Sequence, residues 1–233
     1  MPDFITKPYV LAFDAAMSGC SVALLNASTG ESVSEMRRMI RGQSEILVPM
    51  VQNVLTRSGR IFADIGLIVT TIGPGAFTGL RIGLSAARSF GLSLNIPVAG
   101  VTTTEAIALM AREKTSSINK IIVVLETKRE DLYMQDGSDD PIAIDREHIL
   151  LKYKENDATF CGDGVSRLKR ELGDAWPSQW LVQDGMDLPD PSVIARIGYK
   201  DFKIGKMRPA TPLYLRGADV SQSSRPTRVI AWE

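Results

Sequence analysis

The stretch GPGAFTGLRIG, residues 73–83, is the most specific string in the sequence and joins a predicted strand to a predicted helix. Gly73 and Gly75 can adopt positive φ and let another backbone approach closely. Thr78 can cap the helix that follows, and exposed backbone amides at such a junction can bind an anion. The stretch is not a Walker A loop, and it is not G-x-G-x-x-G because the third glycine, Gly79, is one residue late. A phosphate-type loop and a tight turn that only packs its helix are both open interpretations.

The sequence around this stretch predicts a mixed sheet covered by helices. Apolar runs with short connections predict an antiparallel three-strand meander at 9–14, 20–26 and 32–38. Helical stripes then alternate with buried runs, which predicts a helix at 44–57 capped by Ser44, a strand at 66–73, a helix at 78–94, a strand at 96–101 and a helix at 104–112. This order resembles one lobe of the actin, sugar-kinase and heat-shock ATPase superfamily. We therefore predict an α/β, actin-like (ribonuclease-H-like) fold of two lobes.

The pattern is weaker after residue 113. It predicts a strand at 118–127, a hairpin partner at 130–137 and a helix at 191–198, and it shows no internal repeat. We expect an N-terminal actin-like lobe with partner-docking helices over 1–103, a C-terminal lobe over 104–219 and a disordered tail over 220–233.

The composition excludes several classes of protein. Lys+Arg and Asp+Glu each number 27, and a net charge of zero argues against a stand-alone nucleic-acid binder. No apolar run reaches the ~20 residues that cross a bilayer, and the N-terminus lacks the pattern of a signal peptide. The two cysteines form no disulfide framework. We therefore expect a cytoplasmic protein that does not contact membranes.

Charge is uneven along the chain. Residues 1–125 carry 11 basic and 8 acidic groups, net +3, whereas residues 126–195 carry 8 and 16, net −8. Residues 196–233 carry 8 and 3, net +5. Three differently solvated faces account for this pattern, and so does a bipolar molecule that orients against a charged partner.

The candidate catalytic residues are few. His148 is the single histidine and lies in a polar stretch, so a zinc site on two histidines is impossible, and we expect His148 at the surface. Asp14 ends the first predicted strand, where ATPases of this fold handle metal and phosphate, but Ala15 and Ala16 follow it in place of hydroxyl or glycine residues. We predict no catalytic residue, metal or cofactor, and degenerate nucleotide-type loops at Asp14, Ser18, Gly73, Gly75, Thr78 and Gly79.

The predicted helix 78–94 is apolar almost all round and rich in small residues, which let another backbone come close. The predicted helix 44–57 lies beside it in this topology and has its own apolar stripe. The pair either packs only on the sheet and the second lobe or forms a four-helix arrangement with an equivalent pair from a partner. The predicted interface comprises Ile46, Leu47, Met50, Val51, Val54, Phe77, Leu80, Arg81, Gly83, Leu84, Ala87 and Arg88.

The chain resembles the TsaB family, also called YeaZ, from about Val10 to Asp219. Three strings carry the resemblance: residues 73–83, the helix start QSEILVP at 43–49, and PLYLR at 212–216. Agreement is weaker at ETKR, residues 126–129, and at Gly162-Asp163-Gly164. One departure from the family is the Ala15-Ala16 pair, where members commonly have Thr-Ser.

The resemblance implies a non-catalytic subunit in bacterial synthesis of threonylcarbamoyladenosine on tRNA. It implies a heterodimer with TsaD, which transfers the threonylcarbamoyl group, and a larger complex with the ATPase TsaE. We expect contact with tRNA through that complex, and a homodimer when the chain is alone. The catalytic relative carries His-x-x-x-His on its first helix, and this chain has no histidine at 43–48. The alternatives are an actin-fold ATP-binding enzyme or peptidase that acts alone, and direct tRNA contact through the basic segment 196–233.

Overall fold

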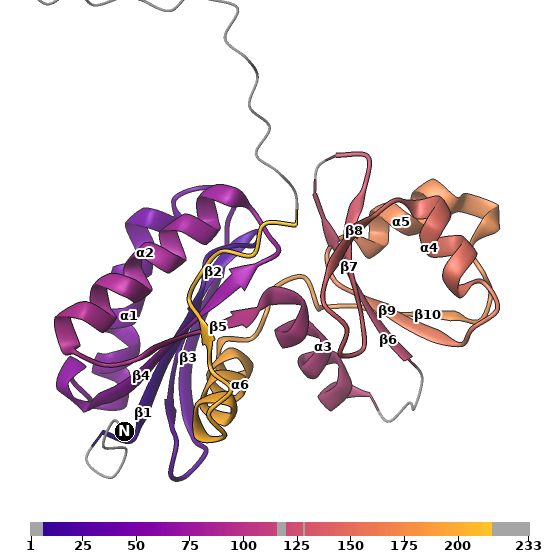
Figure 1. Ribbon diagram of the computed structural model, residues 1–233. Coiled ribbons are helices and arrows are strands. Elements are labelled where there is room, and N and C mark those ends of the chain that lie inside the picture. The colour runs from indigo at the N-terminus through magenta and orange to yellow at the C-terminus, as the bar shows by residue number, and fades with distance from the viewer. Residues whose placement is uncertain (1–6, 116–119, 128, 216–233) are drawn as a thin grey trace, which may run out of the picture.

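The computed structural model describes residues 7–115, 120–127 and 129–215, which form two lobes (Figure 1). The first lobe is built, in chain order, from β1 (Tyr9–Asp14), β2 (Gly19–Asn26), β3 (Ser32–Arg38), α1 (Gln43–Ser58), the 3₁₀ turn η1 (Phe62–Asp64), β4 (Ile65–Gly73), α2 (Phe77–Leu94) and β5 (Val98–Thr102). These bounds agree with the predicted ones to within two residues. The apolar runs and helical stripes of this half of the chain therefore predict its elements correctly.

The second lobe follows the helix α3 (Thr103–Lys114). It contains β6 (Lys120–Glu126), β7 (Leu132–Asp136), β8 (Ile142–Ile144), α4 (Arg146–Tyr153), β9 (Ala158–Cys161), α5 (Val165–Leu172), the 3₁₀ turn η2 (Gly173–Ala175) and β10 (Trp180–Gln183). The chain ends its described part with α6 (Pro191–Lys203) and the short β11 (Arg208–Pro209). Helix α6 runs five residues beyond its predicted end at residue 198.

The two sheets share one order of five strands, and the first sheet adds β11 at its edge. The first runs β11-β5-β4-β1-β2-β3 and the second β10-β9-β6-β7-β8. In each sheet, a three-strand antiparallel meander continues into parallel strands, since β1 pairs with β4 and β6 pairs with β9. The fold class, α/β with two mixed sheets flanked by helices, is confirmed. The sequence shows no internal repeat, and the structure reveals a repeat in strand topology alone.

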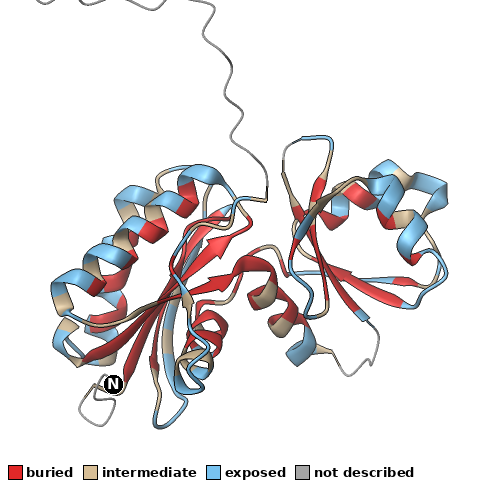
Figure 2. Cartoon of the chain, in the orientation of Figure 1, coloured by how far each residue is buried: buried red, intermediate tan, exposed pale blue. Residues whose placement is uncertain are grey.

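Helices cover both faces of each sheet. Helices α1 and α2 lie on the outer face of the first sheet, and α4 and α5 lie on the outer side of the second (Figure 1). Between the sheets, α6 packs on β1, β2 and β4, while α3 packs mainly on β6 and also contacts α6. A continuous core of buried side chains from both sheets and these two helices fills the centre of the molecule (Figure 2).

The chain returns to the first lobe after completing the second. Helix α6 and β11 follow β10 in sequence, yet α6 packs on the first sheet and β11 pairs with β5. The predicted boundary between 103 and 104 falls one residue inside α3. The domain ranges stay a prediction, and the expected tail at 220–233 lies outside the described residues.

The predicted helix caps are wrong. The N-cap of α1 is Gly42, at φ 95°, and the N-cap of α2 is Ala76. Neither Ser44 nor Thr78 provides a capping side chain, because each helix begins before that residue. Glycine suits the left-handed conformation at position 42, which serine would adopt only at a cost.

Candidate partner-docking surface

Most of the predicted interface side chains are buried inside their own lobe. The apolar stripes of α1 and α2 lie on the first sheet, and eight predicted contact residues are enclosed there: Leu47, Met50, Val51, Val54, Leu80, Gly83, Leu84 and Ala87. A residue that holds its helix to the sheet cannot also present its side chain to a partner. The apolar periodicity therefore marks the inner faces of the two helices.

The outer faces of the same helices carry other residues. Of the predicted set, Phe77, Arg81 and Arg88 are exposed and Ile46 is partly buried. The prediction omitted the exposed apolar side chains Val48, 41% exposed, and Leu92, 86% exposed. It also omitted the exposed serines of α2, Ser85, Ser89 and Ser93. Their spacing of four residues on the side opposite the apolar stripe is the signal that identifies an outer face.

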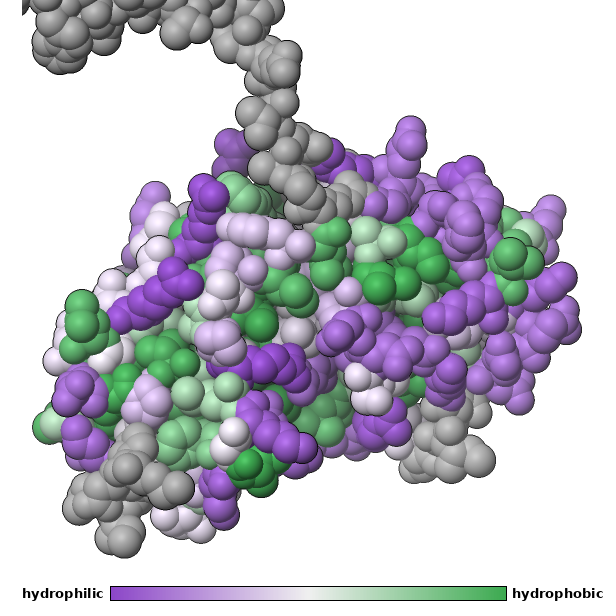
Figure 3. Space-filling view, in the orientation of Figure 1, coloured by the Kyte–Doolittle hydropathy of each residue, from purple (hydrophilic) through white to green (hydrophobic). Residues whose placement is uncertain are grey.

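The hydropathy of the surface differs between the lobes. Figure 3 shows apolar and weakly polar side chains over the lobe that carries α1 and α2, crossed by a few strongly hydrophilic ones. In the same view, the second lobe is more continuously hydrophilic. Removing apolar surface from water lowers the free energy of a complex. The first lobe is therefore the better candidate for an interface with a partner.

The glycine-rich loop packs on its own lobe. A Cβ added at Gly75 would lie 2.7 Å from the carbonyl oxygen of Ala16, and one at Gly79 would collide with the carbonyl oxygen of Ala15. The amide of Ala76 donates to the Ala16 carbonyl at 2.7 Å. The glycines thus let the start of α2 lie directly on the turn between β1 and β2. This geometry supports the close-packing interpretation of the loop.

Asp14 is enclosed in that turn. Its carboxylate accepts hydrogen bonds from the hydroxyl of Thr71 at 2.5 Å and from the amide of Ala16 at 3.1 Å. Burial raises the pKa of this carboxyl, and the hydrogen bond from Thr71 is the larger opposing effect. The structure brings Asp14, Gly73, Gly75 and Gly79 together, whereas Ser18 and Thr78 are exposed.

The second lobe repeats this junction with different chemistry. Gly162 follows β9 as Gly73 ends β4, and the two have φ angles of 105° and 108°. The Asp163 carboxylate accepts from the Glu126 amide at 3.0 Å, and burial raises its pKa to about 6. Arg167 on α5 donates to the side chains of Glu126 and Glu171 and to the carbonyls of residues 130 and 131. Arg167 therefore holds the turn between β6 and β7 in place.

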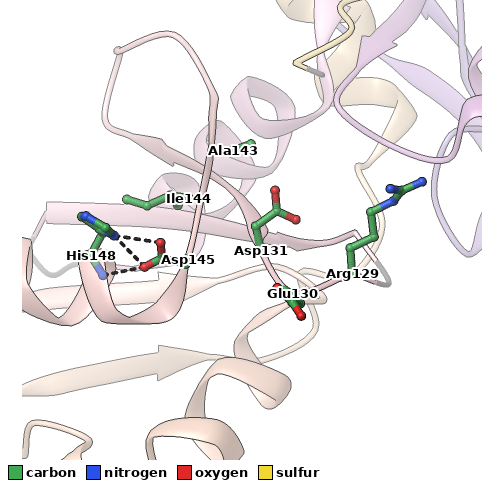
Figure 4. Close-up of a pocket in the computed structure, with 7 residues that line it drawn as sticks. All are labelled: Arg129, Glu130, Asp131, Ala143, Ile144, Asp145 and His148. Atoms are coloured by element: carbon green, nitrogen blue, oxygen red, sulfur yellow. Dashed lines mark hydrogen bonds and ion pairs between the residues drawn. The ribbon is translucent and has the colours of Figure 1, made fainter. Parts of the chain in front are cut away.

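An open cavity lies beside this turn (Figure 4). It is lined by Arg129, Glu130, Asp131, Ala143, Ile144, Asp145 and His148. Nδ1 of His148 lies 2.7 and 2.8 Å from the two carboxylate oxygens of Asp145, which also caps α4. The surface position of His148 is confirmed, because its side chain is 71% exposed. The lining residues include three carboxylates, Glu130, Asp131 and Asp145, and no serine, cysteine or lysine.

Comparisons with known proteins identify the family of this chain. The family model of TsaD, tRNA N6-adenosine threonylcarbamoyltransferase, matches residues 37–197. A protein of Escherichia coli named tRNA threonylcarbamoyladenosine biosynthesis protein TsaB is 29% identical over 226 residues, which cover 89% of this chain and 94% of that protein. The Bacillus subtilis protein of the same name is 26% identical over 224 residues, or 90% and 95% of the two chains. The chain belongs to the TsaB (YeaZ) family, within the wider TsaD family.

A solved structure supports the same fold. YeaZ from Pseudomonas aeruginosa is 22% identical and superposes with a TM-score of 0.75 over 89% of this chain and 99% of that one. In this TsaB-family chain, no helix among the described residues is long and apolar enough to cross a membrane. The described residues also contain no group of three or more His, Cys, Asp or Glu side chains placed to hold a metal ion.

Both cysteines of this TsaB-family chain are buried. Cys20 is the second residue of β2 and Cys161 is the last residue of β9, and neither forms a disulfide. Burial raises the pKa of each thiol to about 12, so at neutral pH both remain protonated. Neither thiol is suited to act as a nucleophile.

Proposed function

We propose that this chain is a non-catalytic scaffold subunit in the biosynthesis of threonylcarbamoyladenosine on tRNA. It binds a TsaD-type subunit through the outer faces of α1 and α2, and a TsaE-type ATPase joins the larger complex. The observation that carries the proposal is the pair of long helices whose outer faces no other described element covers (Figures 1 and 2). The names of the curated relatives supply the pathway.

The outer face of α2 suits close helix packing. Ser85, Ala86, Ser89 and Ser93 are small and at least partly exposed, so a partner helix can approach the backbone closely. Leu92 and, on α1, Val48 add apolar area that a partner would remove from water. The two helices together present a broad face, which is the requirement for a four-helix arrangement with an equivalent pair.

Several observations support a non-catalytic role. The single histidine is tied to Asp145 at the surface, and both thiols are buried and protonated. The Asp14 carboxylate accepts hydrogen bonds from its own lobe, and the glycine loop covers the turn where nucleotide-binding members of the fold bind phosphate. These features support scaffolding over the alternative of a stand-alone ATP-binding enzyme or peptidase.

A bulky charge on the outer face of α2 tests the docking surface. Ser89→Arg places a long side chain where the partner helix would lie, and we expect at least a tenfold loss of affinity for a purified TsaD-type subunit, measured by titration calorimetry. Ser166→Arg is the matched control, because Ser166 is an exposed serine on α5 of the second lobe. Equal affinity of both variants would contradict the proposal.

The same surface accounts for a homodimer of the isolated chain. Multi-angle light scattering at rising concentration is expected to show a dimer for the wild type and a monomer for Ser89→Arg. We expect tRNA to bind to the complex and only weakly to the chain alone, because the net charge is zero. Micromolar binding of ATP and magnesium by the isolated chain would instead support the enzymatic alternative.

A further inference from the structure

Two aromatic rings that are distant in sequence stack at the surface beside α2. Phe77 and Tyr214 are 47% and 46% exposed, and their ring centroids lie 5.4 Å apart at an interplanar angle of 32°. The Arg81 guanidinium carbon lies 3.7 Å from the centroid of the Phe77 ring, and Nε of Arg81 lies 3.5 Å from the Tyr214 hydroxyl. We call Phe77, Arg81 and Tyr214 the aromatic–arginine cluster.

Hydrogen bonds to backbone carbonyls hold the chain segment that carries Tyr214. The amide of Leu213 donates to the Ile72 carbonyl at 2.7 Å. Arg88 donates from Nε and Nη2 to the Ala210 carbonyl at 3.1 and 2.6 Å. The position of Tyr214 is therefore fixed before any partner arrives, which lowers the entropy lost on binding.

The Phe77 ring is poorly placed to stack with a nucleic-acid base. A base stacks on a free ring face. One face of Phe77 is occupied by the Arg81 guanidinium, and its ring is also stacked with Tyr214. The polar groups that the cluster offers are the terminal nitrogens of a guanidinium and a hydroxyl, and they lie beside the ring edges.

Those groups match a carboxylate. Arg81 and Arg88 are the only charged residues of α2. Within the described part of the chain, no acidic side chain is ion-paired with Arg81. The terminal guanidinium nitrogens can bind a carboxylate in a bidentate manner, and the Tyr214 hydroxyl can donate a further hydrogen bond. Arginine and tyrosine are also the residues most enriched at the energetic centres of protein interfaces.

We infer that the aromatic–arginine cluster is an anchor of the docking surface, which binds an acidic side chain of the TsaD-type subunit against the edges of the two rings. The inference rests on the proposed function and extends its surface from α1 and α2 to residues 208–214. It gives the C-terminal Pro-Leu-Tyr string a role in recognition, in addition to packing the chain end through Leu213.

Affinity for the purified TsaD-type subunit tests the inference. Tyr214→Ala and Arg81→Gln are each expected to raise Kd at least about tenfold. Because the hydroxyl and the planar guanidinium are the recognition groups, Tyr214→Phe and Arg81→Lys are expected to weaken binding by a smaller factor. Added salt should reduce the affinity of the wild type more than that of Arg81→Gln. Arg170→Gln, at an exposed arginine of α5, is the control and should bind as the wild type does.

The outcomes separate the two proposals. If the wild type does not bind the TsaD-type subunit, both proposals fail. If Ser89→Arg abolishes binding while Tyr214→Ala and Arg81→Gln, with unchanged melting temperatures, bind as the wild type does, only the cluster is excluded. If Tyr214→Ala instead reduces binding of tRNA to the preformed complex without changing Kd for the subunit, the cluster contacts RNA and the inference is overturned.

Discussion

The two lobes have the same strand order but differ in their outer helices. In the first lobe, α1 and α2 have 16 and 18 residues, whereas α4 and α5 in the second have 8 each. At 1.5 Å per residue, the first pair is about twice as long as the second. A stable interface needs roughly 800 Å² from each partner. The comparison teaches that two lobes with a common sheet can differ in the length of their outer helices, and the longer pair is the one that we propose as the docking surface.

The lobes also differ in charge. The segment 126–195, net −8, supplies most of the second lobe and only the beginning of α6. The described part of the basic segment that follows, residues 196–215, returns to the first lobe through α6 and β11. The folded chain therefore separates charge between its lobes, which favours the bipolar interpretation of the sequence. Such a molecule would orient with its second lobe away from RNA phosphates.

The largest expected effect is at the start of α2. Gly79→Ala places a Cβ against the Ala15 carbonyl, a backbone atom that cannot rotate away, so α2 must shift. We expect a loss of about 3 kcal/mol in the free energy of unfolding, measured in urea. Ser85→Ala on the exposed face of the same helix is the control and should change little. A near-neutral Gly79→Ala would mean that the glycine serves something other than packing.

Removal of Arg167 tests the equivalent junction in the second lobe. Its side chain is 11% exposed and binds two carboxylates and two carbonyls. Arg167→Ala removes these hydrogen bonds and ion pairs from a side chain that is largely buried, and we expect a loss of about 2 kcal/mol in unfolding free energy. Arg170→Ala on the same helix is exposed and should cost less than about 0.5 kcal/mol. Equal effects at the two positions would show that the turn between β6 and β7 does not depend on Arg167.

The pH dependence of stability probes the carboxyl at that junction. The pKa of Asp163 is raised from 3.8 to about 6 by burial, so its ionised form costs stability once the pH rises through this interval. Asp163→Asn removes that cost, and we expect it to match the wild type near pH 4 and to exceed it by about 1–2 kcal/mol at pH 7.5. Urea unfolding at the two pH values measures the difference. A constant difference between the proteins would contradict the assignment.

The smallest effect on stability is expected on the outer face of α2. Leu92 is 86% exposed, so Leu92→Ser should change the unfolding free energy by less than about 0.5 kcal/mol. It should nevertheless weaken binding of the TsaD-type subunit severalfold, because the lost side chain would be buried in the complex. Leu181→Ser on β10, where Leu181 is 50% exposed, should leave that binding unchanged. Equal binding by the two variants would remove Leu92 from the docking surface.

Much of the first lobe can be predicted from sequence because its signals are local. Apolar runs, apolar stripes of helical spacing and glycines lie within or next to the elements that they specify. The strands and helices up to α3 can be predicted from these signals. The surface that an apolar stripe contacts depends on residues that are distant in sequence, so the stripe alone does not predict it. Leu84 and Ala87 were predicted to meet a partner, but the stripe they belong to covers the chain's own sheet.

Other features could not be predicted because they depend on distant contacts. Gly42 replaces Ser44 as the cap of α1, and it adopts a left-handed conformation directly before the helix. Nothing near residues 191–203 indicates that α6 covers β1 and β2, more than 160 residues away. The pairing of Phe77 with Tyr214 is also invisible in sequence, although both residues lie in strings that resemble the family.

The return of α6 to the first sheet has a consequence during translation. The inner face of β1, β2 and β4 is covered by α6, which the ribosome makes only after the whole second lobe. At 5–20 residues per second, the stretch from α3 to the end of α6 takes roughly 5–20 s to synthesise. Throughout that time the nascent first lobe exposes one apolar sheet face, and we expect it to attract chaperones that bind apolar surface while the chain is still attached to the ribosome.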